Sequence, residues 1–267
     1  MKSRLSKLPI FGRLINEIET NVHNLGIQNG FARTFKDHNV EIVADYDEQT
    51  AHILEHEACI LVVNHPHEIE VIALAAALPP RKDAYVIANA GFMAICPSVD
   101  KHILPVYVTN NEQSASNWPF IMRLAGKLHP LASYDANEEH KKNIETINAG
   151  GQKLIEGATV AIFPDRHSTN GHWFNGVGYM TKAAENTTRD LFVVNVFVEG
   201  TTSHDYLRLL RPIAKRLPDI EVHVSQPTKI NDLLDLEPKE ITRILETSYR
   251  EWVASNNKAY SIPKIND

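Results

Sequence analysis

Short apolar runs that stop abruptly at polar residues dominate the hydrophobic pattern of this chain. Four of them lack a helical period and have the lengths of buried strands: 59–63, 84–88, 159–163 and 191–198. Residues 40–45 and 221–225 alternate loosely between apolar and polar side chains, which predicts two further strands, the second of them peripheral. The apolar run 103–108 contains Pro105, so we expect an edge strand or a bent loop there.

Segments with helical spacing of apolar residues separate these strands, at 69–77, 117–132, 138–156 and 238–254. Pro79 and Pro80 end the first and Gly157 ends the third. Pro238 stands at the first turn of the last, which we interpret as a structural helix. Because strands alternate with helices, we predict one α/β domain in which helices flank a mostly parallel, mixed sheet.

The first eighteen residues are amphipathic and basic. Their apolar side chains recur every three or four positions, with Lys2, Arg4, Lys7 and Arg13 between them. A helix of this kind can lie in a membrane interface, or it can cover the edge of a protein core. We expect a helical N-terminal addition, an α/β domain and a C-terminal tail, at 1–38, 39–255 and 256–267.

Composition narrows the class of protein. The 267 residues are 43% hydrophobic, which suffices for one sizeable core. A formal net charge of -6 and a pI near 6.1 leave no electrostatic footprint for nucleic acid. Cys59 and Cys96 lie in apolar surroundings, so we expect buried thiols and a cytoplasmic protein. We find no secretory signal and no apolar run of about 18 residues, so membrane contact would be peripheral, at the inner face.

The strand 59–63 ends in a turn that carries chemistry. His65 follows this strand, at the end where open α/β sheets bind their ligands. Glu70, in the first turn of the next helix, could orient the imidazole and leave its other nitrogen free to accept a proton. A structural role is the alternative, because a helix dipole favours Glu in a first turn and a His before Pro is often only a turn residue.

A second strand end carries similar residues. The run 159–163 stops at Pro164, and Asp165, Arg166 and His167 follow at once. If the two strands are neighbours, their carboxyl ends would line one crevice. Two polar strand ends in one sheet favour a functional site more than either does alone.

These residues also fit a family pattern. Asn64 and His65 are followed by Glu70, and residues 163–169 read Phe-Pro-Asp-Arg-His-Ser-Thr; Gly171, Trp173 or Phe174, and Gly176 come next. From about 39 to 253 the chain resembles the glycerolipid, or lysophospholipid, acyltransferases related to 1-acylglycerol-3-phosphate acyltransferase. Their hallmarks are Asn-His, four residues and Asp, and then a Phe-Pro-Glu-Gly-Thr-Arg-Ser block. This chain departs from them with Glu70 for Asp and with an altered second block.

The resemblance implies that His65 is a general base oriented by Glu70. An acceptor hydroxyl would attack an acyl thioester of coenzyme A or acyl carrier protein, with no acyl-enzyme and no cofactor. The acceptor would be a lysophospholipid, glycerol phosphate or a related molecule, as in phospholipid biosynthesis. Arg166 could make a bidentate contact with a phosphate. The substrate-binding residues would be Asn64, Asp165, Arg166, His167 and Gly171.

Two other functions remain open. His65, His67 and Asp165 are of the types that bind Zn²⁺, so a metal-dependent hydrolase is one alternative. A catalytically inactive lipid-binding protein on the same scaffold is the other, because the second block is altered. We expect no metal site, and we expect partners to be a thioester donor, a hydroxyl acceptor and a membrane surface.

Overall fold

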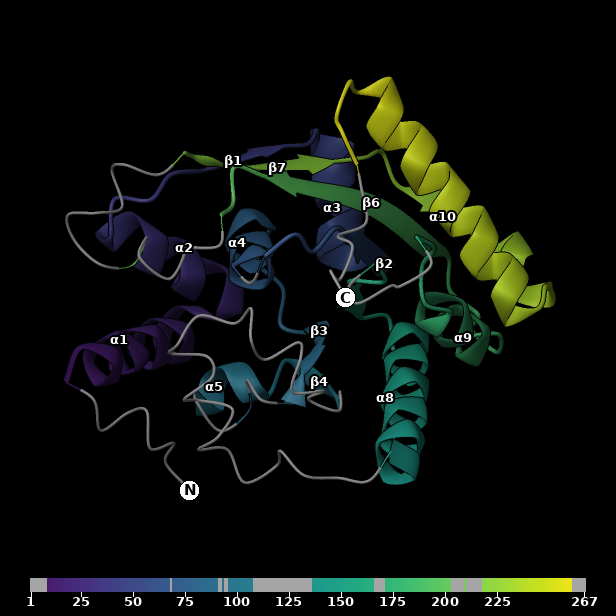
Figure 1. The fold of residues 1–267 in the computed structure, drawn as a ribbon, viewed down its shortest axis with the longest axis horizontal. Coiled ribbons are helices and arrows are strands. Elements are labelled where there is room, and N and C mark those ends of the chain that lie inside the picture. The colour runs from purple at the N-terminus through teal and green to yellow at the C-terminus, as the bar shows by residue number, and fades with distance from the viewer. Residues whose placement is uncertain are drawn as a thin grey trace.

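One mixed sheet forms the centre of the computed structural model, which describes residues 9–67, 69–90, 93, 96–107, 136–165, 171–202, 209 and 218–260 (Figure 1). Within these residues the sheet has eight strands in the order β1-β7-β6-β2-β5-β3-β4, and β8 pairs with β6. The strands are β1 (Ile42–Asp45), β2 (Ala58–Val63), β3 (Ala84–Asn89), β4 (Ile103–Val106), β5 (Thr159–Ile162), β6 (Leu191–Glu199), β7 (Ile220–Val224) and β8 (Thr228–Lys229).

Most neighbouring strands run parallel, as predicted. β2 pairs in parallel with both β5 and β6, β3 does so with β4 and β5, and β1 with β7. Only β7 and β8, among the strands described, pair antiparallel, each with β6. β4, which contains Pro105, lies at the sheet edge, where a residue without an amide hydrogen is tolerated.

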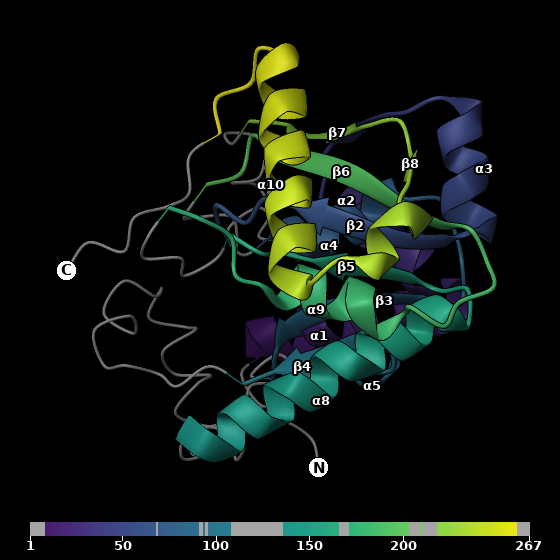
Figure 2. The same ribbon diagram turned by 90° about the vertical axis from the view of Figure 1, so that its right-hand side faces the viewer.

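Helices cover both faces of the sheet. The helices are α1 (Pro9–Leu25), α2 (Ile27–Asp37), α3 (Glu48–His56), α4 (Glu70–Ala77), α5 (Pro97–Asp100), α8 (Ala136–Ile155), α9 (Gly176–Ala183), α10 (Pro238–Ser255) and the 3-10 helix η5 (Asn231–Asp235). In Figure 1, α1, α2 and α4 lie to the left of the central strands, and α8, α9 and α10 lie to the right. In the view of Figure 2, turned by 90°, α10 lies in front of the sheet. The arrangement is the single, helix-flanked α/β domain that the sequence predicts.

The wholly apolar sequence of β2 follows from these two helical layers. All six of its residues are buried. Side chains alternate along a strand, so Ile60 and Val62 join the core beneath α9 and α10, whereas Leu61 and Val63 join the core beneath α4. A strand that is buried on both faces needs apolar residues at every position, which explains the missing alternation.

Several sequence-based boundaries are confirmed and others are corrected. The last helix and the helix before β5 agree with prediction to within two residues. The N-terminal helix extends further than predicted, to Leu25, and Gly26, at a φ of 81°, separates it from α2. The stretch before β2 is not merely a polar connection, because Asp47 accepts a hydrogen bond from the Thr50 amide and begins α3. The predicted helix 117–132 and residues 1–8 lie outside the described residues.

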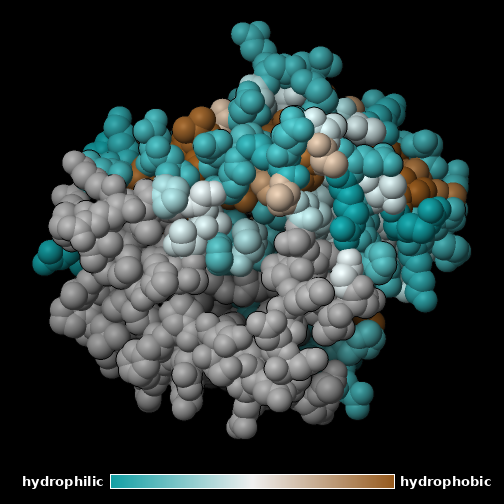
Figure 3. Space-filling view, turned by 45° about the horizontal axis from the view of Figure 1, so that its top comes forward, coloured by the Kyte–Doolittle hydropathy of each residue, from teal (hydrophilic) through white to brown (hydrophobic). Residues whose placement is uncertain are grey.

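The two cysteines are buried and free, as the sequence predicts. Burial raises the pKa of each thiol to about 12, so neither is a reactive thiolate at neutral pH. Large exposed hydrophobic residues are scattered over different elements: Leu25, Val43, Ile144, Phe174 and Tyr179. Figure 3 accordingly shows small separate hydrophobic patches on the coloured part of that face. No helix among the described residues is long and apolar enough to cross a membrane.

Candidate active site

His65 and Glu70 form a hydrogen-bonded pair on the turn between β2 and α4. His65 Nδ1 lies 3.3 Å from Glu70 Oε2. The Glu70 side chain is completely buried, and that of His65 is 10% exposed. His65 follows the carboxyl end of β2, and Glu70 is the first residue of α4, where its carboxylate points back toward the imidazole. The predicted pair is therefore brought together, with the imidazole still reachable from outside.

Two further donors hold the Glu70 carboxylate. Its Oε1 accepts hydrogen bonds from the backbone amide of His67, at 2.9 Å, and from the Thr201 hydroxyl, at 2.8 Å. Burial raises the pKa of Glu70, and these hydrogen bonds and the nearby charge of His67 oppose that rise. The donors therefore favour the ionised carboxylate in a place where burial disfavours it.

An ionised Glu70 carboxylate would fix the tautomer of His65. A carboxylate can only accept hydrogen bonds, so Nδ1 must carry the proton that lies between the two groups. Nε2 then keeps its lone pair and can accept a proton from a hydroxyl or amine. The contact between the two side chains is found as predicted, and their roles as base and orienting carboxylate stay predictions.

Asn64 ties the end of β2 to the end of β6. Its Nδ2 donates to the Val198 carbonyl at 2.9 Å, and its Oδ1 accepts from the Val198 amide at 2.7 Å. The buried amide therefore acts as an extra peptide group in the sheet and fixes the turn from which His65 projects. Its contact with a substrate stays a prediction.

Gly200 lets the chain turn after β6 so that Thr201 reaches Glu70. Its φ is 75°, and an added Cβ would lie 1.9 Å from the Asp219 carbonyl oxygen. Both the left-handed backbone and the close approach require glycine. Thr201 is a site residue that the sequence-based reasoning missed, although the same strand-end rule, applied to β6, points to it.

The end of β5 meets the end of β2, as expected for adjacent strands. The ring of Phe163 packs against His65 with a centroid separation of 4.8 Å. Two residues later, Asp165 is 1% exposed and accepts a hydrogen bond from the Tyr260 hydroxyl at 3.1 Å. Arg166 and His167 lie outside the described residues.

The continuation of the second block is held by α10 and by Tyr260, which follows that helix. The carbonyl of Gly171, a residue with a φ of 74°, accepts a hydrogen bond from Arg250 at 2.8 Å. The amide of Trp173 donates to Glu246, and its indole donates to Tyr260 at 2.8 Å. Trp173 is buried, whereas Phe174 is 54% exposed, so Trp173 is the aromatic residue that packs inward. Substrate contacts of Asp165 and Gly171 stay predictions.

The metal-ligand set of the hydrolase hypothesis does not assemble among the described residues. There, the side chains close enough to share an ion are Glu199, Glu221 and His223, not His65, His67 and Asp165. Glu199 is already bound by Lys258 and by His223, whose Nε2 lies 3.0 Å away. These contacts form an ion-pair network at the sheet end.

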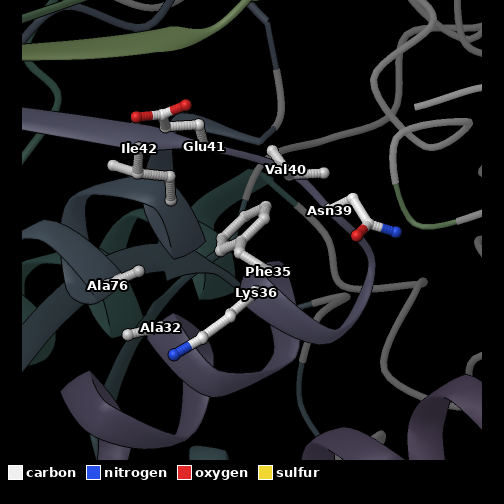
Figure 4. A pocket seen from close by; sticks show the side chains of 8 residues that line it. All are labelled: Ala32, Phe35, Lys36, Asn39, Val40, Glu41, Ile42 and Ala76. Atoms are coloured by element: carbon white, nitrogen blue, oxygen red, sulfur yellow. The ribbon is translucent and has the colours of Figure 1, made fainter. Parts of the chain in front are cut away.

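A pocket of about 470 Å³ lies elsewhere, between α2, α4 and the start of β1 (Figure 4). Its walls include Phe35, Val40, Ile42 and Ala76, with polar Lys36, Asn39 and Glu41 among them. None of its lining residues belongs to the His65 site or to the second block. We assign it no role in the chemistry.

Comparison with known proteins finds a similarity among solved structures. No family model and no curated protein sequence matches this chain. Among solved structures, the chain is similar to the 1-acyl-sn-glycerophosphate (LPA) acyltransferase PlsC from Thermotoga maritima, with 15% sequence identity and a TM-score of 0.48. The match covers 92% of this chain and 81% of that chain. A similarity at this level leaves the role of each residue to be argued from this chain alone.

Proposed function

We propose that the protein is an acyltransferase that moves an acyl group from a thioester to the hydroxyl of a lipid-type acceptor. The observation that carries this proposal is the buried Glu70 carboxylate bonded to His65 Nδ1, which leaves Nε2 as the base. Asn64 and His65 agree with the acyltransferase motif, and Glu70 supplies a carboxylate where the motif has Asp, which supports the choice of reaction.

In the proposed reaction, the two side chains act in sequence. His65 Nε2 takes the proton of the acceptor hydroxyl while its oxygen attacks the thioester carbonyl. Glu70 stabilises the imidazolium that forms. The tetrahedral intermediate then collapses, the carbon–sulfur bond breaks, and the imidazolium returns its proton to the thiolate leaving group. The products are an ester and a free thiol, and no acyl-enzyme forms.

The substrates are inferred from the motif. The donor is acyl-coenzyme A or acyl-acyl carrier protein, and the acceptor is a lysophospholipid, glycerol phosphate or a related hydroxyl compound. Asn64, Asp165, Arg166, His167 and Gly171 are the proposed substrate-binding residues. We place the protein in the cytoplasm, where it could also bind the inner face of the membrane.

A direct test is incubation of the purified protein with acyl-coenzyme A or acyl-acyl carrier protein and a lipid extract. Release of free thiol and a new ester, identified by mass spectrometry, is the expected result. His65→Ala should lower both signals by about 10²–10⁴-fold. If a metal chelator abolishes turnover, the result would favour the metal-dependent hydrolase instead. Lipid binding without any thioester turnover would favour the inactive lipid-binding protein.

A further inference from the structure

The segment 257–260, which follows α10, contacts the ends of both strands that flank the dyad. β2, which leads into the turn that carries His65, lies between β6 and β5 in the sheet. Lys258 forms an ion pair with Glu199, the last residue of β6, and Tyr260 donates a hydrogen bond to Asp165, just beyond β5. One short segment thus spans the strand that bears the proposed base.

Each of these contacts lies two residues from a side chain that touches the dyad. On the β6 side, Glu199 precedes Thr201, whose hydroxyl donates to Glu70. On the β5 side, Asp165 follows Phe163, whose ring packs against His65. Fixing the two strand ends therefore fixes the groups that position the carboxylate and the imidazole.

The direction of the Tyr260 hydrogen bond can be deduced from its partners. The indole nitrogen of Trp173 is only a donor, so the Tyr260 oxygen must accept its hydrogen at 2.8 Å. The hydroxyl hydrogen of Tyr260 is then free to point to Asp165 Oδ2, at 3.1 Å. The chain Trp173 to Tyr260 to Asp165 is consistent in donors and acceptors at every step.

The segment is itself anchored firmly enough to act on the strands. The ring centroids of Tyr260 and Tyr249 are 5.1 Å apart. The Arg250 guanidinium lies 5.3 Å from the centroid of the Tyr260 ring. Tyr249 is completely buried on α10. The long helix α10 therefore provides a rigid base for the contacts that Tyr260 makes.

The Lys258 contact lies in a charged network. Burial alone would raise the pKa of Glu199, but hydrogen bonds from Lys258 and His223 outweigh this and hold it below its usual value. Glu221 also lies 3.4 Å from His223. Lys258 thus supplies a positive charge at a sheet end where two carboxylates meet, and it joins the segment 257–260 to β6.

We propose that the segment 257–260 is a clamp that positions the dyad, with Lys258 and Tyr260 as its positioning residues. This inference rests on the proposed acyl transfer for its kinetic consequences. Neither residue touches the reacting atoms. Lys258 acts through β6 on Thr201 and Glu70, and Tyr260 acts through the end of β5 on Phe163 and His65.

The first test compares two double variants of the full chain. Misplacement of a catalytic group by about 1 Å can cost about 100-fold in rate, and we expect a smaller displacement of the dyad here. The double variant Lys258→Met with Tyr260→Phe should therefore lower kcat about tenfold, with little change in KM for the thioester. Lys229→Met with Tyr179→Phe is the matched control. It removes an exposed lysine–carboxylate pair with Asp190 and an exposed tyrosine hydroxyl, and it should keep the normal kcat. Equal kcat values for the two double variants would overturn the clamp.

The second test asks through which residue each contact acts. Lys258→Met should have little further effect on kcat in a Thr201→Val background, because their shared route to Glu70 is already broken. Tyr260→Phe should likewise have little further effect in a Phe163→Leu background. In the crossed combination, Lys258→Met with Phe163→Leu, the two effects should multiply. If the effects of the two substitutions on kcat multiply in all three combinations, the positioning role would be contradicted and a general loss of stability would be favoured.

A third readout does not depend on activity. The ¹⁵N resonances of the His65 ring, assigned with His65→Ala, report which nitrogen holds the proton. They should change in the Lys258→Met, Tyr260→Phe double variant and not in the control. If the wild-type protein transfers no acyl group, the proposed function fails, and the clamp is still judged by these resonances. Unchanged His65 resonances in the double variant would refute it.

Discussion

Replacing Glu70 by glutamine tests the central geometry most sharply. The amide oxygen can still accept hydrogen bonds from the His67 amide and the Thr201 hydroxyl, as Oε1 does now. The amide nitrogen then takes the place of Oε2 and faces His65 Nδ1, which lies 3.3 Å away. Because this nitrogen only donates, it favours the tautomer of His65 that carries its proton on Nε2. The imidazole would then present a hydrogen to the acceptor in place of a lone pair.

The expected magnitude follows from losing the base. General-base catalysis contributes about 10²–10⁴-fold, and a carboxylate-to-amide change in a Ser-His-Asp triad costs about 10⁴-fold through the wrong tautomer. We therefore expect Glu70→Gln to lower kcat by about 10³-fold. Thiol release from acyl-coenzyme A with acceptor present measures this loss. Glu48→Gln, which changes an exposed first-turn glutamate on α3, is the control and should keep full activity.

Glu70→Gln should lower activity, but we expect it to keep or increase the stability of the fold at neutral pH. Burial raises the pKa of Glu70 in the folded state, so its contribution to stability is fully present below the unfolded pKa and is lost as pH rises through the folded pKa. Glutamine does not titrate and escapes this loss. At neutral pH the melting temperature of Glu70→Gln should therefore match or exceed that of the wild type, and the difference should shrink on acidification. A variant that keeps the wild-type rate, or that loses activity only because it unfolds, would refute the reasoning.

Substitutions at four other positions give further predictions. His65→Ala should lose about 10²–10⁴-fold in acyl transfer and stay folded by circular dichroism, whereas His67→Asn, which keeps the backbone amide that binds Glu70, should be far more active. Thr201→Val removes a hydrogen bond to a carboxylate, worth about 1.5–3 kcal/mol, so the acid limb of kcat/KM should move to higher pH and Thr201→Ser should restore it. Arg81→Met removes the hydrogen bonds that Arg81 donates to the half-exposed Asp83 carboxylate and to the carbonyls of Leu54, Glu57 and Gly157, and it should lower the free energy of unfolding in urea by about 1–3 kcal/mol without a specific effect on the site.

The sequence predicts the parts of the fold that depend on local pattern. The strand β2 and the helix α10 carry strong periodicities or wholly apolar runs, and both are found within a residue or two of prediction. The helix α3 was missed because it buries little, with only Thr50 and Leu54 inaccessible. Its start depends on the Asp47 cap, which is a weaker signal than a hydrophobic face.

The candidate site divides in the same way. His65 and Glu70 are five positions apart on one turn, so their meeting could be predicted from the motif and its spacing. Thr201 reaches Glu70 from 131 positions away, and Tyr260 reaches Asp165 from 95. Contacts at such separation depend on strand order, on the turn at Gly200 and on the path of the chain after α10. None of these has a local signature.

The structure gives a reason why glutamate serves at position 70. Its completely buried carboxylate needs several donors to stay ionised, and these come from three places: the imidazole of His65, the backbone of His67 and the hydroxyl of Thr201 on the β6 side. Aspartate, one methylene shorter, would have to give up either the imidazole or the hydroxyl unless the turn moved inward. Glu70 and Thr201 therefore form a matched pair, in which the longer side chain at position 70 reaches both the imidazole and a hydroxyl from a neighbouring strand.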